Sequence, residues 1–166
     1  MTNVLVAFAT KGGTTQAIAE RLGSGLTDAG HAVTVVPVQD DPDPAAYDAV
    51  VIGSGVMSGS VYASAGQWVS AHRKGLAHKP TGVFVVCLDI ASGERSRIEQ
   101  ARDYPSQLVA LLPEEPIGTT VFAGPHEPQW RARWERLAAR VGRAPRGDFR
   151  DWGAVDDWGG ELTGRL

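Results

Sequence analysis

A short loop near the start of the chain has the residue types of a phosphate-binding site. Residues 4–9 are apolar and strand-forming, and they lead into a polar cluster that precedes a segment with helical spacing. The cluster consists of Thr10, Lys11, Gly12, Gly13, Thr14 and Thr15. The free N–H groups and dipole of a helix N-terminus favour an anion there, while the hydroxyls add donors and the glycines allow close approach. We therefore expect phosphate binding, with Lys11 either neutralising the phosphate charge or remaining solvated.

Two further loops follow apolar runs and have compositions suited to lining a ligand. One is the Gly/Ser-rich stretch at residues 53–62, and the other is the short loop at residues 89–93. If the preceding runs are parallel strands, both loops lie at the sheet edge that also carries the first loop, where doubly wound folds bind ligands. The residues expected along the ligand are Ser54, Gly55, Val56, Met57, Ser58, Gly59, Tyr62, Leu88, Asp89 and Ile90.

Apolar runs and helical stripes alternate along the whole chain. Strands are expected at residues 4–9, 31–38, 47–54, 81–88 and 117–124. The first helix carries a stripe of Ile18, Leu22 and Leu26 and ends at Gly30; later helices are expected at residues 65–76, 94–112 and 130–141 and within the tail 147–166. The alternation predicts an α/β fold with a parallel sheet, right-handed crossovers and helices on both faces. We expect a single domain over residues 1–166, with the tail packed on it, and a break or kink at Pro105.

Composition sets bounds on the environment and partners of the chain. Its 166 residues are 43% apolar and 21% charged, with a net charge of −3, which gives no electrostatic reason to expect nucleic acid. Cys87 is the only cysteine, so no intramolecular disulfide can form, and the chain is compatible with a reducing cytosol. No apolar run is long enough to span a bilayer, so we expect no integral membrane segment and a cytoplasmic location.

Other phosphate-binding families do not match the loops. The nucleotide P-loop string G-x-x-x-x-G-K-[ST] is absent, and no G-x-G-x-x-G follows the first strand. Gly53, Gly55 and Gly59 have the wrong spacing for that fingerprint and follow the wrong strand. A phosphoacceptor receiver domain would need acidic residues after the first strand and an aspartate at the end of the third, and neither is present.

The remaining pattern, T-x-x-G-x-T at Thr10, Gly13 and Thr15, resembles the flavodoxin loop that holds the phosphate of FMN. The resemblance covers nearly the whole chain, and residues 47–54 look like the third strand of that family. It implies a five-stranded sheet of order 2-1-3-4-5 and FMN as the cofactor. The ending at residues 147–158 is similar to a narrower branch, the flavodoxin-domain proteins related to the quinone-dependent protoporphyrinogen oxidase.

The resemblance also implies roles for single residues near the expected flavin ring. That branch often has aromatic residues about where Met57 and Val61 stand, whereas Tyr62 is the obvious aromatic of this loop. Tyr62 could stack on the flavin or pack at the start of the next helix. Asp89 could approach a ring nitrogen through its backbone or be a solvated acid, and Cys87 is expected to be an inert buried thiol.

Three functions therefore stay open. The first is FMN-dependent electron transfer to or from a redox partner protein. The second is a flavoenzyme of the protoporphyrinogen oxidase type that passes electrons to a quinone. The third is a flavodoxin-like interaction module that has lost flavin, which the residues at Met57 and Val61 would favour. No catalytic acid, base or nucleophile stands out, and because His72 and His126 lack ligand-pair spacing we expect no metal site.

Overall fold

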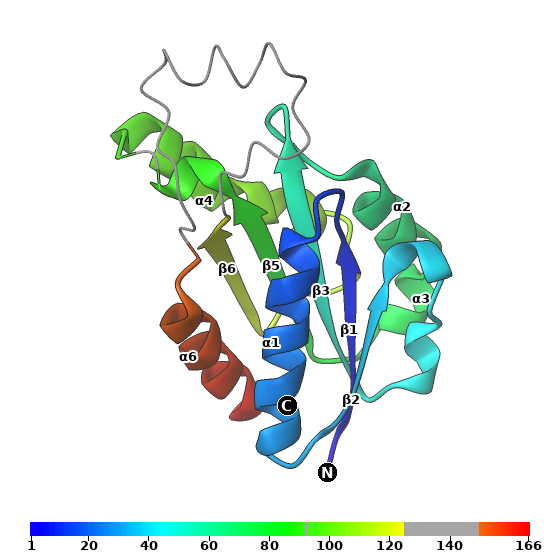
Figure 1. Cartoon of the computed structure of the whole chain (residues 1–166). Coiled ribbons are helices and arrows are strands. Elements are labelled where there is room, and N and C mark those ends of the chain that lie inside the picture. Colours follow the sequence, from blue (N-terminus) through cyan, green and yellow to red (C-terminus); the bar gives the residue numbers. More distant parts are fainter. Residues whose placement is uncertain (92, 125–149) are drawn as a thin grey trace.

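A computed structural model of the chain describes residues 1–91, 93–124 and 150–166, and it forms an open sheet between two helical layers (Figure 1). The strands are β1 (Asn3–Ala9), β2 (Ala32–Pro37), β3 (Ala49–Met57), β4 (Ser60–Val61), β5 (Thr81–Cys87) and β6 (Gly118–Ala123). The helices are α1 (Thr14–Asp28), α2 (Ala63–Ala71), α3 (Arg73–Leu76), α4 (Arg95–Val109) and α6 (Trp152–Thr163). The helix expected at residues 130–141 lies outside the described residues.

The main sheet has the order β2-β1-β3-β5-β6, and all of its pairings are parallel. The short strand β4 pairs only with β3 and is not part of this order, so β5 and β6 are the fourth and fifth of the predicted strands. The structure therefore confirms the predicted order 2-1-3-4-5. Val6 of β1 lies opposite Val35 of β2 on one side and Val51 of β3 on the other. The central strands are buried on both faces, which explains why their sequences read as continuous apolar runs rather than alternating ones.

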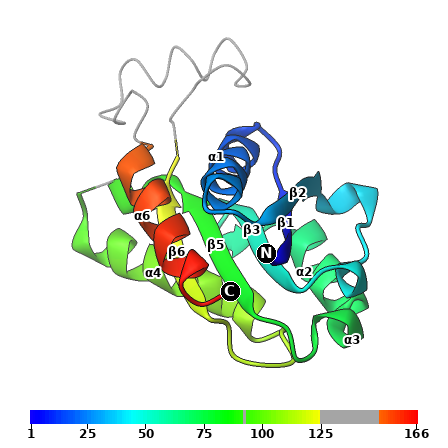
Figure 2. The same ribbon diagram turned by 90° about the horizontal axis from the view of Figure 1, so that it is seen from below.

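Helices cover both faces of the sheet, as the view from below shows (Figure 2), and each face has its own apolar core. On one face Val4, Val6 and Phe8 of β1 meet the apolar stripe of α1 and the buried side of α6. On the other face the intervening residues Leu5 and Ala7 meet α2, α3 and α4. The period-2 alternation of a strand thus divides β1 between two cores, and both fix the position of the loop that follows it.

Two helices differ from the sequence-based expectation. The segment expected as one helix over residues 65–76 is divided at His72, whose ring nitrogen lies 2.6 Å from a carboxylate oxygen of Asp41. In contrast, α4 runs unbroken past Pro105, so the predicted break is wrong. Pro105 is buried together with Tyr104 and Leu108, and packing against the sheet outweighs the missing backbone hydrogen bond.

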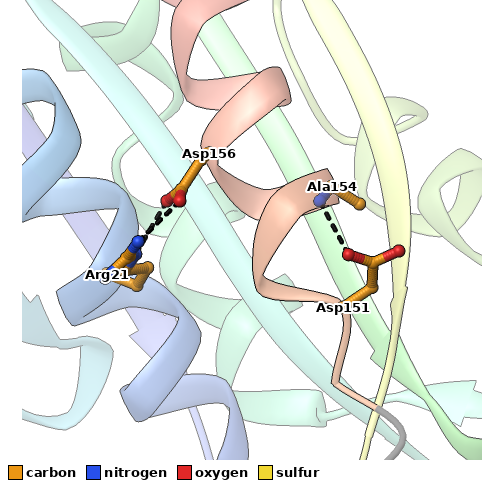
Figure 3. A network of polar contacts seen from close by, with 4 residues as sticks. All are labelled: Arg21, Asp151, Ala154 and Asp156. Atoms are coloured by element: carbon orange, nitrogen blue, oxygen red, sulfur yellow. Dashed lines mark hydrogen bonds and ion pairs between the residues drawn. The ribbon is translucent and has the colours of Figure 1, made fainter.

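The C-terminal helix α6 lies beside α1, and a polar pair joins the two helices (Figure 3). Its N-terminus is capped by Asp151, whose carboxylate accepts a hydrogen bond of 3.0 Å from the N–H of Ala154. The Arg21 guanidinium donates two hydrogen bonds, of 2.7 and 2.6 Å, to the carboxylate of Asp156. Beneath this pair Trp158 and its apolar neighbours on α6 enter the core.

The Arg21–Asp156 pair predicts a pH-dependent contribution to stability. The hydrogen bond from Arg21 lowers the pKa of Asp156 below its ordinary range. A lowered folded-state pKa stabilises the fold above the unfolded-state pKa, and this contribution disappears as the pH falls through the folded-state value. We expect Asp156→Asn to lower the urea midpoint only slightly at pH 7, because both groups are partly exposed. The difference from wild type should begin to shrink near the unfolded-state pKa of about 4 and vanish once the pH is below the lowered folded-state pKa.

The matched control for this prediction is Asp157→Asn, which removes the same charge from an exposed neighbour on α6. It should leave the midpoint near the wild-type value throughout the pH range. Equal losses for the two variants at pH 7 would attribute the effect to net charge and would contradict a specific role for the pair.

Among the described residues, none of the helices combines the length and apolar content that crossing a membrane requires.

Candidate functional site

The loop after β1 has the backbone geometry of an open helix N-terminus. Gly13, the N-cap of α1, has φ +84°, a left-handed conformation that L side chains rarely adopt. Its N–H donates a 2.9 Å hydrogen bond to Oγ1 of Thr10, which closes the loop on itself. Within the described residues no side chain caps α1, so the N–H groups of its first turn remain available to a ligand.

The other two threonines of the loop begin α1. Thr15 is only 2% exposed, and no hydrogen bond of its hydroxyl is found within the part of the chain that the structure describes. Thr14 lies beside the end of β6, since a Cβ built on Gly124 would stand 3.7 Å from the Thr14 methyl group. The end of β6 thus borders the first turn of α1, a neighbourhood that the sequence pattern did not reveal.

The Gly/Ser-rich loop after β3 is mostly a tight hairpin. Strand β3 continues through Met57 and pairs antiparallel with β4, with Met57 opposite Ser60. The two turn residues, Ser58 and Gly59, both have positive φ angles, 53° and 79°, as two-residue hairpin turns of this hand require. The expected loop is therefore wrong at residues 55–57 and 60–61, which belong to β3 and β4, because the Ser-Gly pair supplies the turn that lets the chain fold back.

A side chain from α4 supports this hairpin. Gln107 accepts a 3.1 Å hydrogen bond from the N–H of Val61 through Oε1. Its Nε2 donates a 3.3 Å hydrogen bond to the carbonyl of Gly59. Sequence spacing gives no signal for Gln107, because its contacts join residues 46 and 48 positions apart.

Tyr62 packs against the strand rather than standing free in the loop. A Cβ on Gly55 would lie 2.6 Å from Cε2 of Tyr62, so the ring needs the space that this glycine leaves. The backbone N–H of Tyr62 donates to the Ser54 hydroxyl at 3.0 Å and to the Gly55 carbonyl at 3.2 Å. Ser54 itself is fully buried and donates back to the Gly55 carbonyl. Burial also raises the pKa of Tyr62 above its ordinary range.

Lys11 connects the first loop with the hairpin. Its ammonium nitrogen lies 3.8 Å from the sulfur of Met57 and 5.2 Å from the ring centroid of Tyr62. Met57 is 52% exposed, an unusual position for a large apolar side chain among the described residues. Lys11, Met57 and Tyr62 therefore form one surface across the ends of β1 and β3.

The third predicted loop is the 3₁₀ turn Leu88–Ala91 after β5. Asp89 bends back on the end of the strand, with its N–H 3.4 Å from the Cys87 sulfur and its carboxylate 3.6 Å from the same atom. Cys87 is buried at 4% exposure, as expected of a structural thiol. Burial raises the pKa of Tyr104, and the neighbouring Cys87 and Asp89 raise it further.

The three loops leave the carboxyl ends of β1, β3 and β5, which are consecutive strands of the sheet. Thr10 to Thr15 and Met57 to Tyr62 are joined through Lys11. Leu88 and Asp89 are half-buried at the end of β5, and of the side chain of Ile90 nothing is described. The arrangement supplies anion donors at β1, apolar and aromatic surface at β3 and a carboxylate at β5.

Two histidines outside the three loops have acidic partners within the fold. His72 contacts Asp41 at 2.6 Å, and His78 contacts Glu114 at 2.7 Å. No group of three or more His, Cys, Asp or Glu side chains in the described ranges could hold a metal ion. His126 lies outside those ranges.

Comparison with known proteins agrees with this geometry. The sequence matches the family model of the flavodoxin domain over residues 5–140. Protoporphyrinogen IX dehydrogenase (quinone) of Escherichia coli strain K12 is 29% identical over 122 residues, which are 72% of this chain and 67% of that protein. Oxidised flavodoxin 1 from Bacillus cereus is similar in structure, with a TM-score of 0.61, 13% identity and 99% coverage of both chains. A flavodoxin from the domain Archaea has a TM-score of 0.60, with 14% identity over 98% of this chain and 97% of that one. Because the family model spans most of the sequence, the chain belongs to the flavodoxin domain family.

Proposed function

We propose that residues 1–166 act as one flavodoxin-like domain that binds FMN and transfers electrons through it. The observation that carries this proposal is the uncapped N-terminus of α1, with Gly13 at φ +84°, beside the junction of β1 and β3. In a sheet of this order, ligands bind at the point where the strand order reverses, which here is the β1/β3 junction. Free helix N–H groups at that point suit the phosphate of FMN.

The residues of the site divide between the two ends of the cofactor. Thr10 holds the loop in shape, while Thr14, Thr15 and the backbone of the first helical turn would bind the phosphate. The hairpin and the turn after β5 would flank the ring and limit its contact with water. FMN supplies the reversible uptake of electrons, and the protein supplies binding, orientation and electrostatics. FMN therefore fits the donor set and surface that the three loops provide.

The electron acceptor defines two versions of this function. A redox partner protein is the acceptor in the first version, which the flavodoxin family supports. The printed name and 29% identity of the Escherichia coli relative support a second, in which a substrate is oxidised and a quinone takes the electrons. We place either activity in the cytoplasm, since a chain with one cysteine needs no oxidising compartment.

A reoxidation experiment separates the two versions. FMN-loaded protein is reduced without oxygen and mixed in a stopped-flow instrument with either cytochrome c or a soluble naphthoquinone, while flavin absorbance is followed. Faster reoxidation by cytochrome c than by the quinone supports a partner protein, and the reverse preference together with protoporphyrinogen consumption supports the quinone enzyme. Protein that retains no FMN would refute both versions and favour the interaction module.

A further inference from the structure

Lys11 has a position that phosphate binding does not explain. Its backbone belongs to the phosphate loop, but its side chain reaches away from that loop to the end of β3. The ammonium nitrogen lies 3.8 Å from Met57 Sδ and 5.2 Å from the centre of the Tyr62 ring. Since β1 and β3 are neighbours in the sheet, the side chain spans the junction at which the strand order reverses.

The surface under the ammonium is held in place from two sides. The Tyr62 ring rests on Gly55, and its backbone N–H is fixed by Ser54 and by the Gly55 carbonyl. The hairpin that carries Met57 is fixed by the side-chain amide of Gln107, whose oxygen and nitrogen each make one hydrogen bond to it. Lys11 thus has a defined platform, and the ring quadrupole of Tyr62 favours a cation above its face.

The charge on Lys11 is not neutralised by a nearby acid. The ion pairs found among the described residues do not include Lys11. A thioether and a phenol ring attract an ammonium group, but neither cancels its charge. A full positive charge therefore lies at the β1/β3 junction, on the side of the hairpin.

We propose that Lys11 sets the redox potential of the bound cofactor by stabilising its reduced state. This inference rests on the proposed function, in which FMN binds with its ring beside the hairpin. When two electrons and one proton enter the flavin ring, its net charge becomes more negative by one unit. A positive charge close to the ring favours the reduced state over the oxidised state by Coulomb attraction, and so raises the potential.

The test is Lys11→Met, which keeps the length and apolar contacts of the side chain and removes its charge. Potentials are measured by anaerobic reduction in equilibrium with a reference dye, and affinities for oxidised FMN and riboflavin by fluorescence titration. The preference of the protein for reduced over oxidised FMN should fall about tenfold, which lowers a two-electron potential by about 30 mV. The ratio of FMN to riboflavin affinity should not change. Lys11→Arg, which keeps the charge, should retain the wild-type potential.

The matched control is Lys74→Met, which removes one charge from an exposed lysine on α3. The nine residues of α2, about 14 Å of helix, separate this lysine from the hairpin. The redox potential of FMN bound to Lys74→Met should therefore equal that of FMN bound to wild type. Equal shifts in the two Met variants would overturn the inference in favour of net charge. If Lys11→Met leaves the redox potential unchanged but lowers the ratio of FMN to riboflavin affinity, the inference is overturned, and Lys11 binds the phosphate instead. If the wild type binds no FMN, the proposed function fails first and this inference with it.

Discussion

Trp158→Ala should reduce the free energy of unfolding by about 3–5 kcal/mol, the usual cost of removing a buried large aromatic side chain. Trp158 is 7% exposed and lies in the core between α1, α6 and the sheet. Its ring meets those of Phe84 and Phe122 edge to face, at centroid distances of 6.1 and 5.8 Å. Urea denaturation followed by circular dichroism measures the effect. In a thermal scan the midpoint should fall by roughly 6–20 °C for a chain of this size.

Trp152, on the same helix, provides the matched control. It is only partly buried at the start of α6, with the Arg150 guanidinium 4.9 Å from its ring centroid. Trp152→Ala should therefore cost clearly less than Trp158→Ala, and Trp158→Phe should recover part of the loss. A denaturation midpoint unchanged by Trp158→Ala would mean that α6 does not pack on the sheet in solution.

Thr15→Ala should weaken FMN binding by roughly 10- to 100-fold and leave riboflavin binding unchanged. A hydrogen bond to a charged acceptor contributes about 1.5–3 kcal/mol, and each 1.4 kcal/mol is about a tenfold change in affinity. The Thr15 hydroxyl, in the first turn of α1, has no other hydrogen bond within the described residues, so its loss should affect phosphate binding alone. Fluorescence quenching of each flavin gives both affinities.

Two further variants show whether the effect is specific. Thr15→Ser keeps the hydroxyl and should retain most of the FMN affinity. Thr27→Ala makes the same change near the other end of α1, where the hydroxyl donates to the Gly23 carbonyl, and should leave both flavin affinities unchanged. A parallel loss of FMN and riboflavin in Thr15→Ala would indicate damage to the fold. No loss for either would place the phosphate elsewhere.

The strand-loop-helix start of the chain and the parallel sheet were predictable because their signals are local. Residues 4–9 read as a strand buried on both faces, and Gly13 with its threonine neighbours marks the entry to a helix. Predicting the strand order required the resemblance to flavodoxins. The alternation of strands and helices predicts a parallel sheet, but it does not say which strands lie next to each other. The structure confirms that order.

The hairpin side of the candidate site was less predictable because distant residues determine it. Ser58 and Gly59 have positive φ angles and form a hairpin turn, whereas the Gly/Ser-rich composition of residues 53–62 predicts only a loop. Gln107 of α4 and Lys11 of the first loop both contact the hairpin. No local sequence pattern encodes these two contacts. Pro105 failed as a helix breaker for the same reason, since burial against the sheet outweighs local propensity.

The central claim, that the loop after β1 binds the phosphate of FMN, is tested most directly by titrating flavin-free wild-type protein with FMN and with riboflavin. The two ligands share the ring and the ribityl chain and differ in the phosphate. We expect FMN to bind at least about 100-fold more tightly, because the free N–H groups of α1 and the threonine hydroxyls provide several charge-assisted hydrogen bonds. Equal affinities for the two flavins, or no binding of either, would contradict it.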